Sequence, residues 1–181
     1  MLITSFMSLS DMVLATLPST SLASSTLMLL PIFTSYIIAI MKPDIYLDID
    51  GVLLANDLNP ANYVHDFLVK VREGANNVYW LTTHCNGDAS TAVKRLSMVL
   101  EPRTMELLKD IKPTAWETAK TRAINMQEPF LWFDDDLFFE ERQALEANQV
   151  LDNWIEVDLA KNPDQLLNFV KSFPMPINAI K

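Results

Sequence analysis

The sequence predicts an α/β fold in which a mainly parallel sheet lies between two layers of helices. Short and almost wholly apolar runs occur at 45–49, 78–81, 130–133 and 154–157, and segments with a helical pattern separate them. A strand that is apolar along its whole length is buried on both faces, which is typical of parallel sheets covered by helices. The alternation of strand and helix also provides the crossover connections that parallel pairing requires.

Polar residues mark the expected starts of the first two helices. Asn59 and Pro60 supply a cap and a first-turn proline for a helix that runs to about Arg72. Asp88 can cap the next helix, which carries apolar residues at helical spacing as far as Leu100. Each helix follows one strand and precedes the next, so both fit the crossover pattern.

The remaining helices are expected at about 103–124, 138–148 and 163–173. The first of them is broken near Pro113, where Thr114 and Glu117 have the spacing of a capping box. Asp136 is the expected cap of the second. The four tryptophans and the pair Phe138–Phe139 are expected to pack in the core or at its edge.

Composition excludes several classes of protein. A chain of 181 residues with 50% hydrophobic content can bury a core and is not disordered. A net charge of -9 argues against general nucleic-acid binding, which depends on Lys and Arg. The single cysteine, Cys85, cannot form an internal disulfide and fits a reducing compartment. Three glycines leave little from which to build a glycine-rich phosphate loop.

Residues 1–41 differ from the rest, which we treat as one domain over 42–181. Thirteen of the first forty residues are Ser or Thr, and the sole charge is Asp11. The run 22–41 has fourteen apolar residues in twenty, enough to span a bilayer, although Pro31 interrupts it. Three interpretations stay open: a start assigned too far upstream of Met41, a membrane or export segment, and a packed N-terminal extension.

Acidic and hydroxyl side chains gather where the predicted strands end. Asp48 and Asp50 follow the first strand, Thr82 follows the second, and Asp134 and Asp135 follow the third. In open parallel sheets, ligands bind at the carboxyl ends of the strands. Two carboxylate groups at one edge repel each other unless a divalent cation lies between them, and an all-oxygen ligand set favours Mg²⁺. Because Mg²⁺ prefers phosphate oxygens, the expected substrate is a phosphate compound.

Simpler explanations exist for each of these groups taken alone. An Asp-x-Asp-Gly sequence also occurs in solvated turns and calcium loops, and an acidic turn can serve only to cap a helix. Thr83, His84 and Cys85 can line the same edge of the sheet. A lone His-Cys pair is nevertheless more often an ordinary loop than a metal site.

The motifs in their order resemble the haloacid dehalogenase (HAD) superfamily of phosphohydrolases. The sequence Asp-Ile-Asp-Gly-Val-Leu at 48–53 resembles the first motif, Thr82 the second, a lysine before the last motif strand the third, and Phe-Asp-Asp at 133–135 the fourth. The resemblance covers about residues 44–158. It implies a three-layer, Rossmann-like α/β/α fold, Mg²⁺ as cofactor and a phosphate monoester as substrate.

The resemblance also implies a role for each carboxylate. Asp48 would attack phosphorus and form an aspartyl-phosphate. Asp50 would protonate the leaving oxygen, then activate water, and its backbone carbonyl would help to hold the metal. The metal ligands would then be Asp48, Asp50, Asp134 and Asp135. An Asp at the position of Asp50 is typical of the phosphatases in this superfamily, whereas dehalogenases lack it and transport ATPases carry Thr.

Thr82 and a lysine would bind the phosphoryl group. Lys120 is the preferred lysine because it lies in a Lys-Thr sequence shortly before the third motif strand. Lys112 is the alternative, because the expected capping box at Thr114 would place it just ahead of a helix N-terminus.

No large cap domain is expected. Only 31 residues separate Asp50 from Thr82, and 37 separate Thr82 from Lys120. The expected partner is a phosphorylated substrate, either a small molecule or a macromolecule. Capless members of the superfamily often act on large substrates, so an open site speaks against a small metabolite. We expect a cytoplasmic protein, or a membrane-anchored or exported one if 22–41 is a true hydrophobic segment, which would be its only membrane contact. The alternative function is a catalytically inactive HAD-like binding or structural module, which the segment 22–41 would tether to a membrane if it is a true hydrophobic segment.

Overall fold

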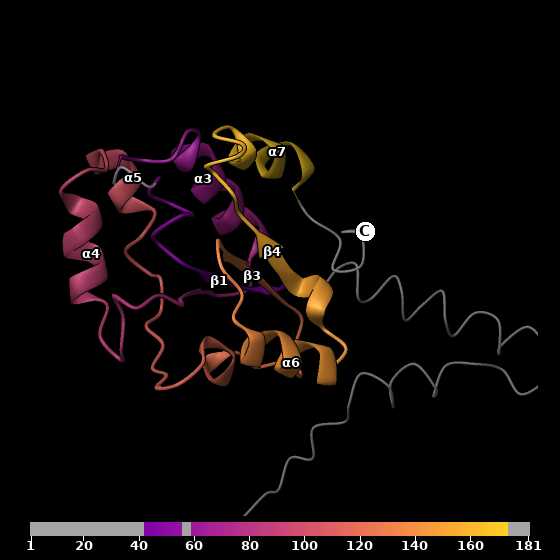
Figure 1. The fold of residues 1–181 in the computed structure, drawn as a ribbon. Helices are drawn as coiled ribbons and strands as arrows, with labels where there is room; N and C mark the ends of the chain where they lie inside the picture. The colour runs from indigo at the N-terminus through magenta and orange to yellow at the C-terminus, as the bar shows by residue number, and fades with distance from the viewer. Residues whose placement is uncertain (1–41, 56–58, 174–181) are drawn as a thin grey trace, which may run out of the picture. The chain divides into compact units, whose positions relative to one another are not determined.

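Four parallel strands form one sheet with the order β2-β1-β3-β4 (Figure 1). The computed structural model describes residues 42–55 and 59–173. The strands are β1 (Asp44–Leu47), β2 (Val78–Trp80), β3 (Phe130–Asp134) and β4 (Trp154–Glu156). The predicted α/β class and its parallel sheet are therefore confirmed.

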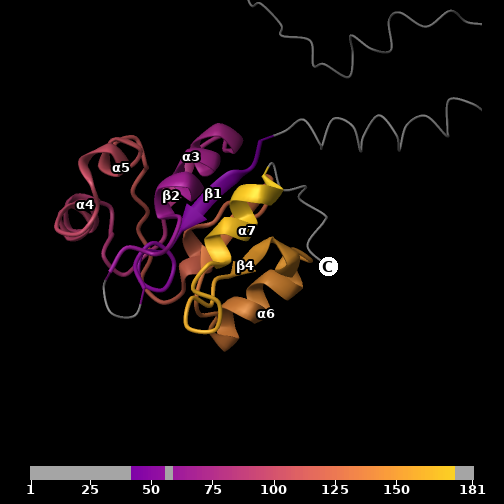
Figure 2. The ribbon, with the colours of Figure 1, turned by 90° about the horizontal axis from the view of Figure 1, so that it is seen from above.

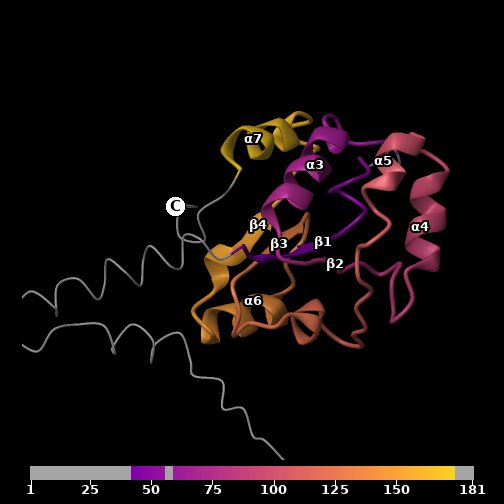
Figure 3. The ribbon, with the colours of Figure 1, turned by 180° about the vertical axis from the view of Figure 1, so that it is seen from behind.

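Helices cover both faces of this sheet and lie beyond its β2 edge (Figures 1, 2 and 3). They are α3 (Val64–Gly74), α4 (Ser90–Ser97), α5 (Pro102–Glu106), α6 (Phe139–Ala147) and α7 (Gln165–Ser172), with short 3-10 turns at Lys120–Ala123 and Leu151–Asn153. Figures 1 and 3 show α3 and α7 on one side of the sheet and α6 on the other. Seen from above in Figure 2, α4 and α5 lie beyond the β2 edge.

The alternation of side chains along each strand divides the core into two layers. Leu47 and Phe133 point to the α3 and α7 side, where Phe67 of α3 meets Phe133 with ring centroids 5.2 Å apart. Tyr46 and Trp132 point to the opposite side and pack near α6. Burying each large apolar side chain contributes about 1.5–3 kcal/mol, so both helical layers are held mainly by apolar packing.

The strand register brings the carboxyl ends of β1, β2 and β3 to one edge of the sheet. Leu47, the last residue of β1, pairs with Trp80 on one side and with Phe133 on the other. The pairing continues past the strand ends, because the backbone N–H of Asp48 donates to the Phe133 carbonyl at 3.1 Å and that of Leu81 donates to Leu47 at 2.8 Å. The residues that follow these strands are thus held to the same register.

The first helix begins later than predicted. Residues 59–61 do not open α3, because their backbone pairs with the segment before it: the Ala61 N–H donates to the Leu53 carbonyl at 2.9 Å, and Pro60 bridges Leu54. Tyr63 then adopts a left-handed conformation with φ 62° immediately before α3. The cap and proline pattern was therefore misread as a helix start.

The predicted helical region at 103–124 is mostly not helical. Only α5 and the 3-10 turn at 120–123 form there, and residues 114–119 are not helical. Lys112 instead pairs with the β2 edge, donating its N–H to the Val78 carbonyl and accepting from the Trp80 N–H, both at 2.9 Å. The Thr114 hydroxyl donates to the Trp80 carbonyl at 2.5 Å. Pairing at the sheet edge outweighs the local capping-box pattern.

Two details at the start of α6 also differ from the predictions. Phe138 and Phe139 are 63% and 72% exposed, so they do not pack the core. The backbone N–H of Phe138 donates to the Glu141 side chain at 3.2 Å, so Glu141, not Asp136, satisfies the start of this helix. The tryptophans follow the prediction, since Trp80 and Trp132 are fully buried and Trp116 and Trp154 are partly buried.

Within residues 42–55 and 59–173, no helix is both long enough and apolar enough to cross a membrane. The segment 22–41 and the whole of 1–41 lie outside the described residues. All described residues belong to one compact unit, Ala39–Lys181. In the described part of the chain, the segment between Asp50 and Thr82 contains α3 as its helix, and the segment from Thr82 to Lys120 contains α4 and α5.

Candidate metal and phosphate site

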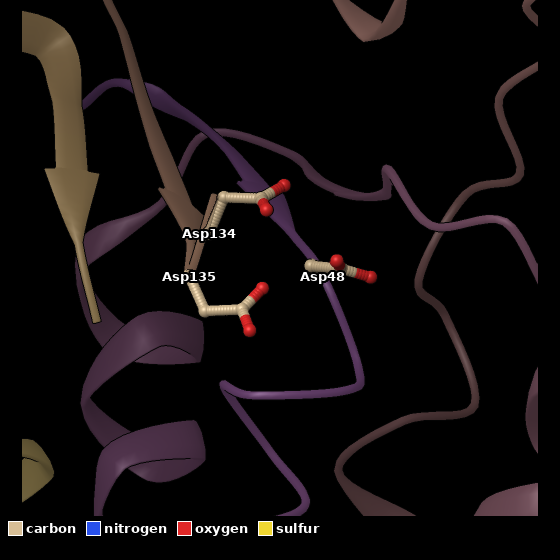
Figure 4. A group of neighbouring side chains, drawn as sticks. All are labelled: Asp48, Asp134 and Asp135. Atoms are coloured by element: carbon tan, nitrogen blue, oxygen red, sulfur yellow. The ribbon is translucent and has the colours of Figure 1, made fainter. Parts of the chain in front are cut away.

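Three carboxylates meet where β1 and β3 end. Asp48 directly follows β1, Asp134 is the last residue of β3, and Asp135 is the next. Figure 4 shows the side chains of Asp134 and Asp135 pointing toward Asp48. One ligand oxygen from each lies within 4.8 Å of the other two, a grouping that can hold a metal ion. The sequence predicts a metal site at this edge of the sheet, and these three carboxylates form a grouping of that kind.

Lys120 lies against this carboxylate cluster of Asp48, Asp134 and Asp135. Its Nζ is 2.8 Å from Asp48 Oδ2 and 2.6 Å from Asp134 Oδ2. The 3-10 turn that carries Lys120 is fixed by α6, because the Lys120 backbone N–H donates to Glu141 Oε1 at 2.8 Å. Lys120 itself is buried, so its ammonium is largely removed from water. A buried charge needs such partners, and each of these groups supplies them for the others.

Burial and mutual repulsion shift the pKa values within the cluster. Burial, together with the negative charge of Asp48, raises the pKa of Asp134 to about 7, although Lys120 acts in the opposite direction. Burial and the charge of Asp48 also raise the pKa of Asp135. Burial lowers the pKa of Lys120, but the two carboxylates outweigh it and the net shift is upward. The site thus holds more negative charge than one ammonium neutralises, which is a favourable setting for a divalent cation.

A second hydrogen-bonding arrangement holds Asp134 in place. The indole Nε1 of Trp132, two residues earlier on the same face of β3, donates to Asp134 Oδ2 at 2.9 Å. The backbone N–H of Asp136 donates to Asp134 Oδ1 at 3.3 Å. The backbone N–H of Asp136 therefore helps to fix the orientation of the Asp134 carboxylate.

The side chain of Asp50 lies outside the carboxylate cluster. Its Oδ1 accepts from Arg95 Nη2 and its Oδ2 accepts from His84 Nε2, both at 2.7 Å. Burial acts to raise the pKa of Asp50, but the hydrogen bonds and charges of Arg95 and His84 outweigh it, and the pKa falls below its usual value. The resemblance assigns Asp50 to the metal through its backbone carbonyl, a role that does not need its side chain in the cluster.

Gly51 allows the turn after β1 to lie close to Asp135 at the end of β3. Its φ is +76°, and a Cβ added there would be 2.2 Å from the Asp135 carboxyl carbon. A side chain at this position is strained by the backbone conformation and would require the Asp135 side chain to move. The glycine of Asp-x-Asp-Gly thus has a structural reason to be present.

Thr82 and Lys112 have different positions relative to the cluster. Thr82 is fully buried just past β2, and its hydroxyl oxygen accepts from the His84 N–H at 3.4 Å. Within the ranges that the structure describes, no hydrogen bond joins Thr82 to the carboxylate cluster. Lys112 is exposed and donates to the Asn77 side chain at 2.6 Å. Of the two candidate lysines, Lys120 is therefore the one that reaches the carboxylates.

Sequence reasoning missed three residues that shape this region. Arg95 reaches Asp50 from 45 positions away, His84 was assigned to an ordinary loop, and Glu141 links α6 to the turn of Lys120. A sign was available for His84, because it directly follows the strand-end residues Thr82 and Thr83. Nothing in the local pattern around Arg95 or Glu141 indicates their partners.

Comparison with known proteins leaves the site to be interpreted from its geometry. No protein-family model matches the chain, no curated protein matches it, and no solved structure matches it.

Proposed function

We propose that this protein is a Mg²⁺-dependent phosphatase of the HAD type, which transfers the phosphoryl group of a monoester to Asp48 and then to water. The observation that carries the proposal is the convergence of Asp48, Asp134 and Asp135, whose ligand atoms lie within 4.8 Å of one another, with Lys120 in contact and Asp50 two residues from Asp48. The order of these residues along the chain agrees with the motifs that the sequence resembles.

The residues fit a hard divalent cation. The ligand set is entirely carboxylate, and burial together with the negative charge of Asp48 raises the pKa of both Asp134 and Asp135. Asp48, Asp134 and Asp135 would hold the ion. When bound, Mg²⁺ neutralises charge so that an anionic phosphate can approach an anionic nucleophile.

Asp48 is the nucleophile in this proposal. Its backbone is fixed by the hydrogen bond to the Phe133 carbonyl, and its Oδ1 accepts from the Ile49 N–H at 2.7 Å. These contacts hold the carboxylate in one orientation, as a nucleophile that must meet phosphorus in line requires. Lys120 balances the charge on the transferred phosphoryl group, and the hydroxyl of Thr82 is the further phosphate donor that the resemblance implies.

Asp50 moves the protons. In the first step it gives a proton to the leaving oxygen, and in the second it takes one from the attacking water. Arg95 and His84 favour its carboxylate form, which is the form needed for the second step. A phosphate dianion bound beside Asp50 raises its pKa and so favours the protonated form needed for the first step.

A second candidate function is a structural module without catalysis, and one observation favours it. Lys120 already pairs with both Asp48 and Asp134, so the buried charges have partners without any metal. In that case Mg²⁺ would neither bind nor stabilise the protein.

The test uses the purified full chain with p-nitrophenyl phosphate and Mg²⁺. We expect phosphate release that needs Mg²⁺, is abolished by EDTA and is lost in Asp48→Asn, whereas Asp66→Asn, an exposed position on α3, leaves it unchanged. Because a selective enzyme can ignore this substrate, a second measurement follows the unfolding temperature with Mg²⁺ and beryllium fluoride, which mimics a phosphoryl group on Asp48. A stabilisation present in wild type and absent in Asp48→Asn supports the proposal. Absence of both turnover and stabilisation would favour the structural module.

A further inference from the structure

Two side chains from separate parts of the chain hold the carboxylate of Asp50. His84 comes from the loop after β2, and Arg95 comes from α4. Each donates to a different oxygen of Asp50, at 2.7 Å. The Asp50 side chain is 45% exposed, and those of His84 and Arg95 are 25% and 27% exposed. An aspartate this exposed would sample several rotamers, and one donor on each oxygen restricts it to one.

We propose that His84 and Arg95 are positioning residues, which fix the carboxylate of Asp50 for proton transfer to the leaving group and from water. The inference rests on the proposed phosphatase function and extends it to two residues outside the carboxylate cluster. Neither residue touches the reacting atoms in this proposal. Both act through Asp50.

Stability alone does not account for this arrangement. Partly exposed ion pairs add little to the stability of a folded protein, so stability does not explain why both donors converge on Asp50. Arg95 also carries a cost, because its Nε is buried with no hydrogen-bond partner among the described residues. The contact between Arg95 Nη2 and Asp50 thus forms although Arg95 Nε has no partner among the described residues. This cost favours a chemical role for the contact.

The proton transfers that Asp50 performs balance in both steps. In the first, an Asp48 oxygen forms a bond to phosphorus, the bond from phosphorus to the leaving oxygen breaks, and the Asp50 proton moves to that oxygen. In the second, a water oxygen bonds to phosphorus, the Asp48–phosphorus bond breaks, and Asp50 regains a proton from the water. A carboxyl that rotates freely would be misaligned for both transfers, and misalignment costs rate without affecting substrate binding.

The experiment compares two substrates that differ mainly in the basicity of the leaving group. Phenol leaves as a strong base that needs a proton, whereas p-nitrophenol leaves readily without one. The full-length variants His84→Leu and Arg95→Met are assayed with phenyl phosphate and p-nitrophenyl phosphate in Mg²⁺, and kcat/KM is compared because it reports the first transfer to Asp48. We expect kcat/KM for phenyl phosphate to fall about 10- to 100-fold more than that for p-nitrophenyl phosphate.

Conservative variants and matched controls separate positioning from damage to the fold. Arg95→Lys and His84→Gln each keep a donor, so we expect them to recover part of the phenyl phosphate activity. His65→Gln removes the other histidine, which contacts Thr104 at 2.9 Å, and Arg72→Met removes an arginine paired with a surface carboxylate. Neither control should change the ratio between the two substrates.

The outcomes distinguish this inference from the function on which it rests. If wild type hydrolyses neither substrate with Mg²⁺, the proposed function fails and the positioning inference fails with it. If wild type is active but both substrates lose activity equally in the variants, or neither does, the positioning inference alone is overturned. A change in the ratio, with partial recovery in the conservative variants, supports it.

Discussion

Replacing Lys120 with Met tests the carboxylate cluster most directly. Methionine fills a similar volume but carries no charge, so the change removes the ammonium and leaves Asp48, Asp134 and Asp135 in place. At the observed distances of 2.8 and 2.6 Å, each ion pair amounts to about 6 kcal/mol at an effective dielectric constant of about 20. The cost of burying the ammonium offsets part of that attraction. Breaking a buried pair on one side therefore costs about 3–5 kcal/mol in practice.

Protonation limits the loss in this variant. The pKa of Asp134 is already raised to about 7 with Lys120 present, and the ammonium is what holds it from rising further. Without Lys120, Asp134 takes up a proton near neutral pH, which removes one of the repelling charges. We therefore expect a loss near the lower end of that range, about 3 kcal/mol at pH 7 in the absence of metal.

The assay is urea unfolding of wild type, Lys120→Met and the control Lys112→Met, each in EDTA and in Mg²⁺. Lys112 is exposed, and its ammonium contacts the Asn77 side chain and lies 5.6 Å from the centroid of the Tyr79 ring, so its replacement should change the free energy of unfolding by no more than about 1 kcal/mol. Mg²⁺ should stabilise Lys120→Met more than wild type, because the ion then meets three carboxylates without a competing ammonium. A loss below about 1 kcal/mol in EDTA would refute the buried bridging position of Lys120.

Three further predictions follow from other features of the site. In EDTA, the raised pKa of Asp134 means that the folded protein keeps a proton on this carboxyl that the unfolded chain loses near pH 4. The contribution of Asp134 to the free energy of unfolding should therefore be present at low pH and fall by about 1.4 kcal/mol per pH unit up to about pH 7. Urea unfolding of wild type and Asp134→Asn measures this contribution as the difference between the two proteins, and a difference that does not change with pH would contradict the prediction. Gly51→Ala should lower the free energy of unfolding by about 1–3 kcal/mol, as measured by thermal unfolding, and should weaken Mg²⁺ binding because the new methyl group displaces the Asp135 side chain. An unchanged Mg²⁺ affinity would show that Asp135 is not a ligand. Cys85 is buried, which raises the pKa of its thiol and shields the sulfur from solvent. A disulfide reagent at pH 8 should therefore label the native protein about a hundredfold more slowly than the urea-unfolded chain. Equal labelling rates would contradict the packing around Cys85.

The strand-end carboxylates were predictable from sequence because their signal is local. Apolar runs that stop at Asp48 and at Asp134 identify two buried strands, and parallel pairing then requires their ends to meet. The expected fold class follows from the same runs. Lys120 was also identified, although only by its place in a motif order, since the pattern around it does not indicate a 3-10 turn.

The predictions that failed depend on tertiary contacts that the local sequence pattern does not indicate. Thr114 has a capping-box neighbour in sequence, but the carbonyl of Trp80 at a sheet edge is its actual partner. Phe138 and Phe139 look like core residues by type, yet both stand exposed at the start of α6. The contact of Arg95 with Asp50 crosses 45 positions, and no residue type or local spacing encodes it.

The register between β1 and β3 determines which parts of the site are insensitive to insertions and substitutions elsewhere in the sequence. Because the Asp48 backbone donates to the Phe133 carbonyl, the separation between the two acidic groups is set by the spacing of neighbouring strands, about 4.8 Å, and not by any loop. The loop of His84 and helix α4 make no contribution to that spacing. Insertions or substitutions there can alter what reaches Asp50 while the carboxylate geometry stays constant. The sheet therefore preserves the spacing of the site's charges even where the segments that follow the strands change.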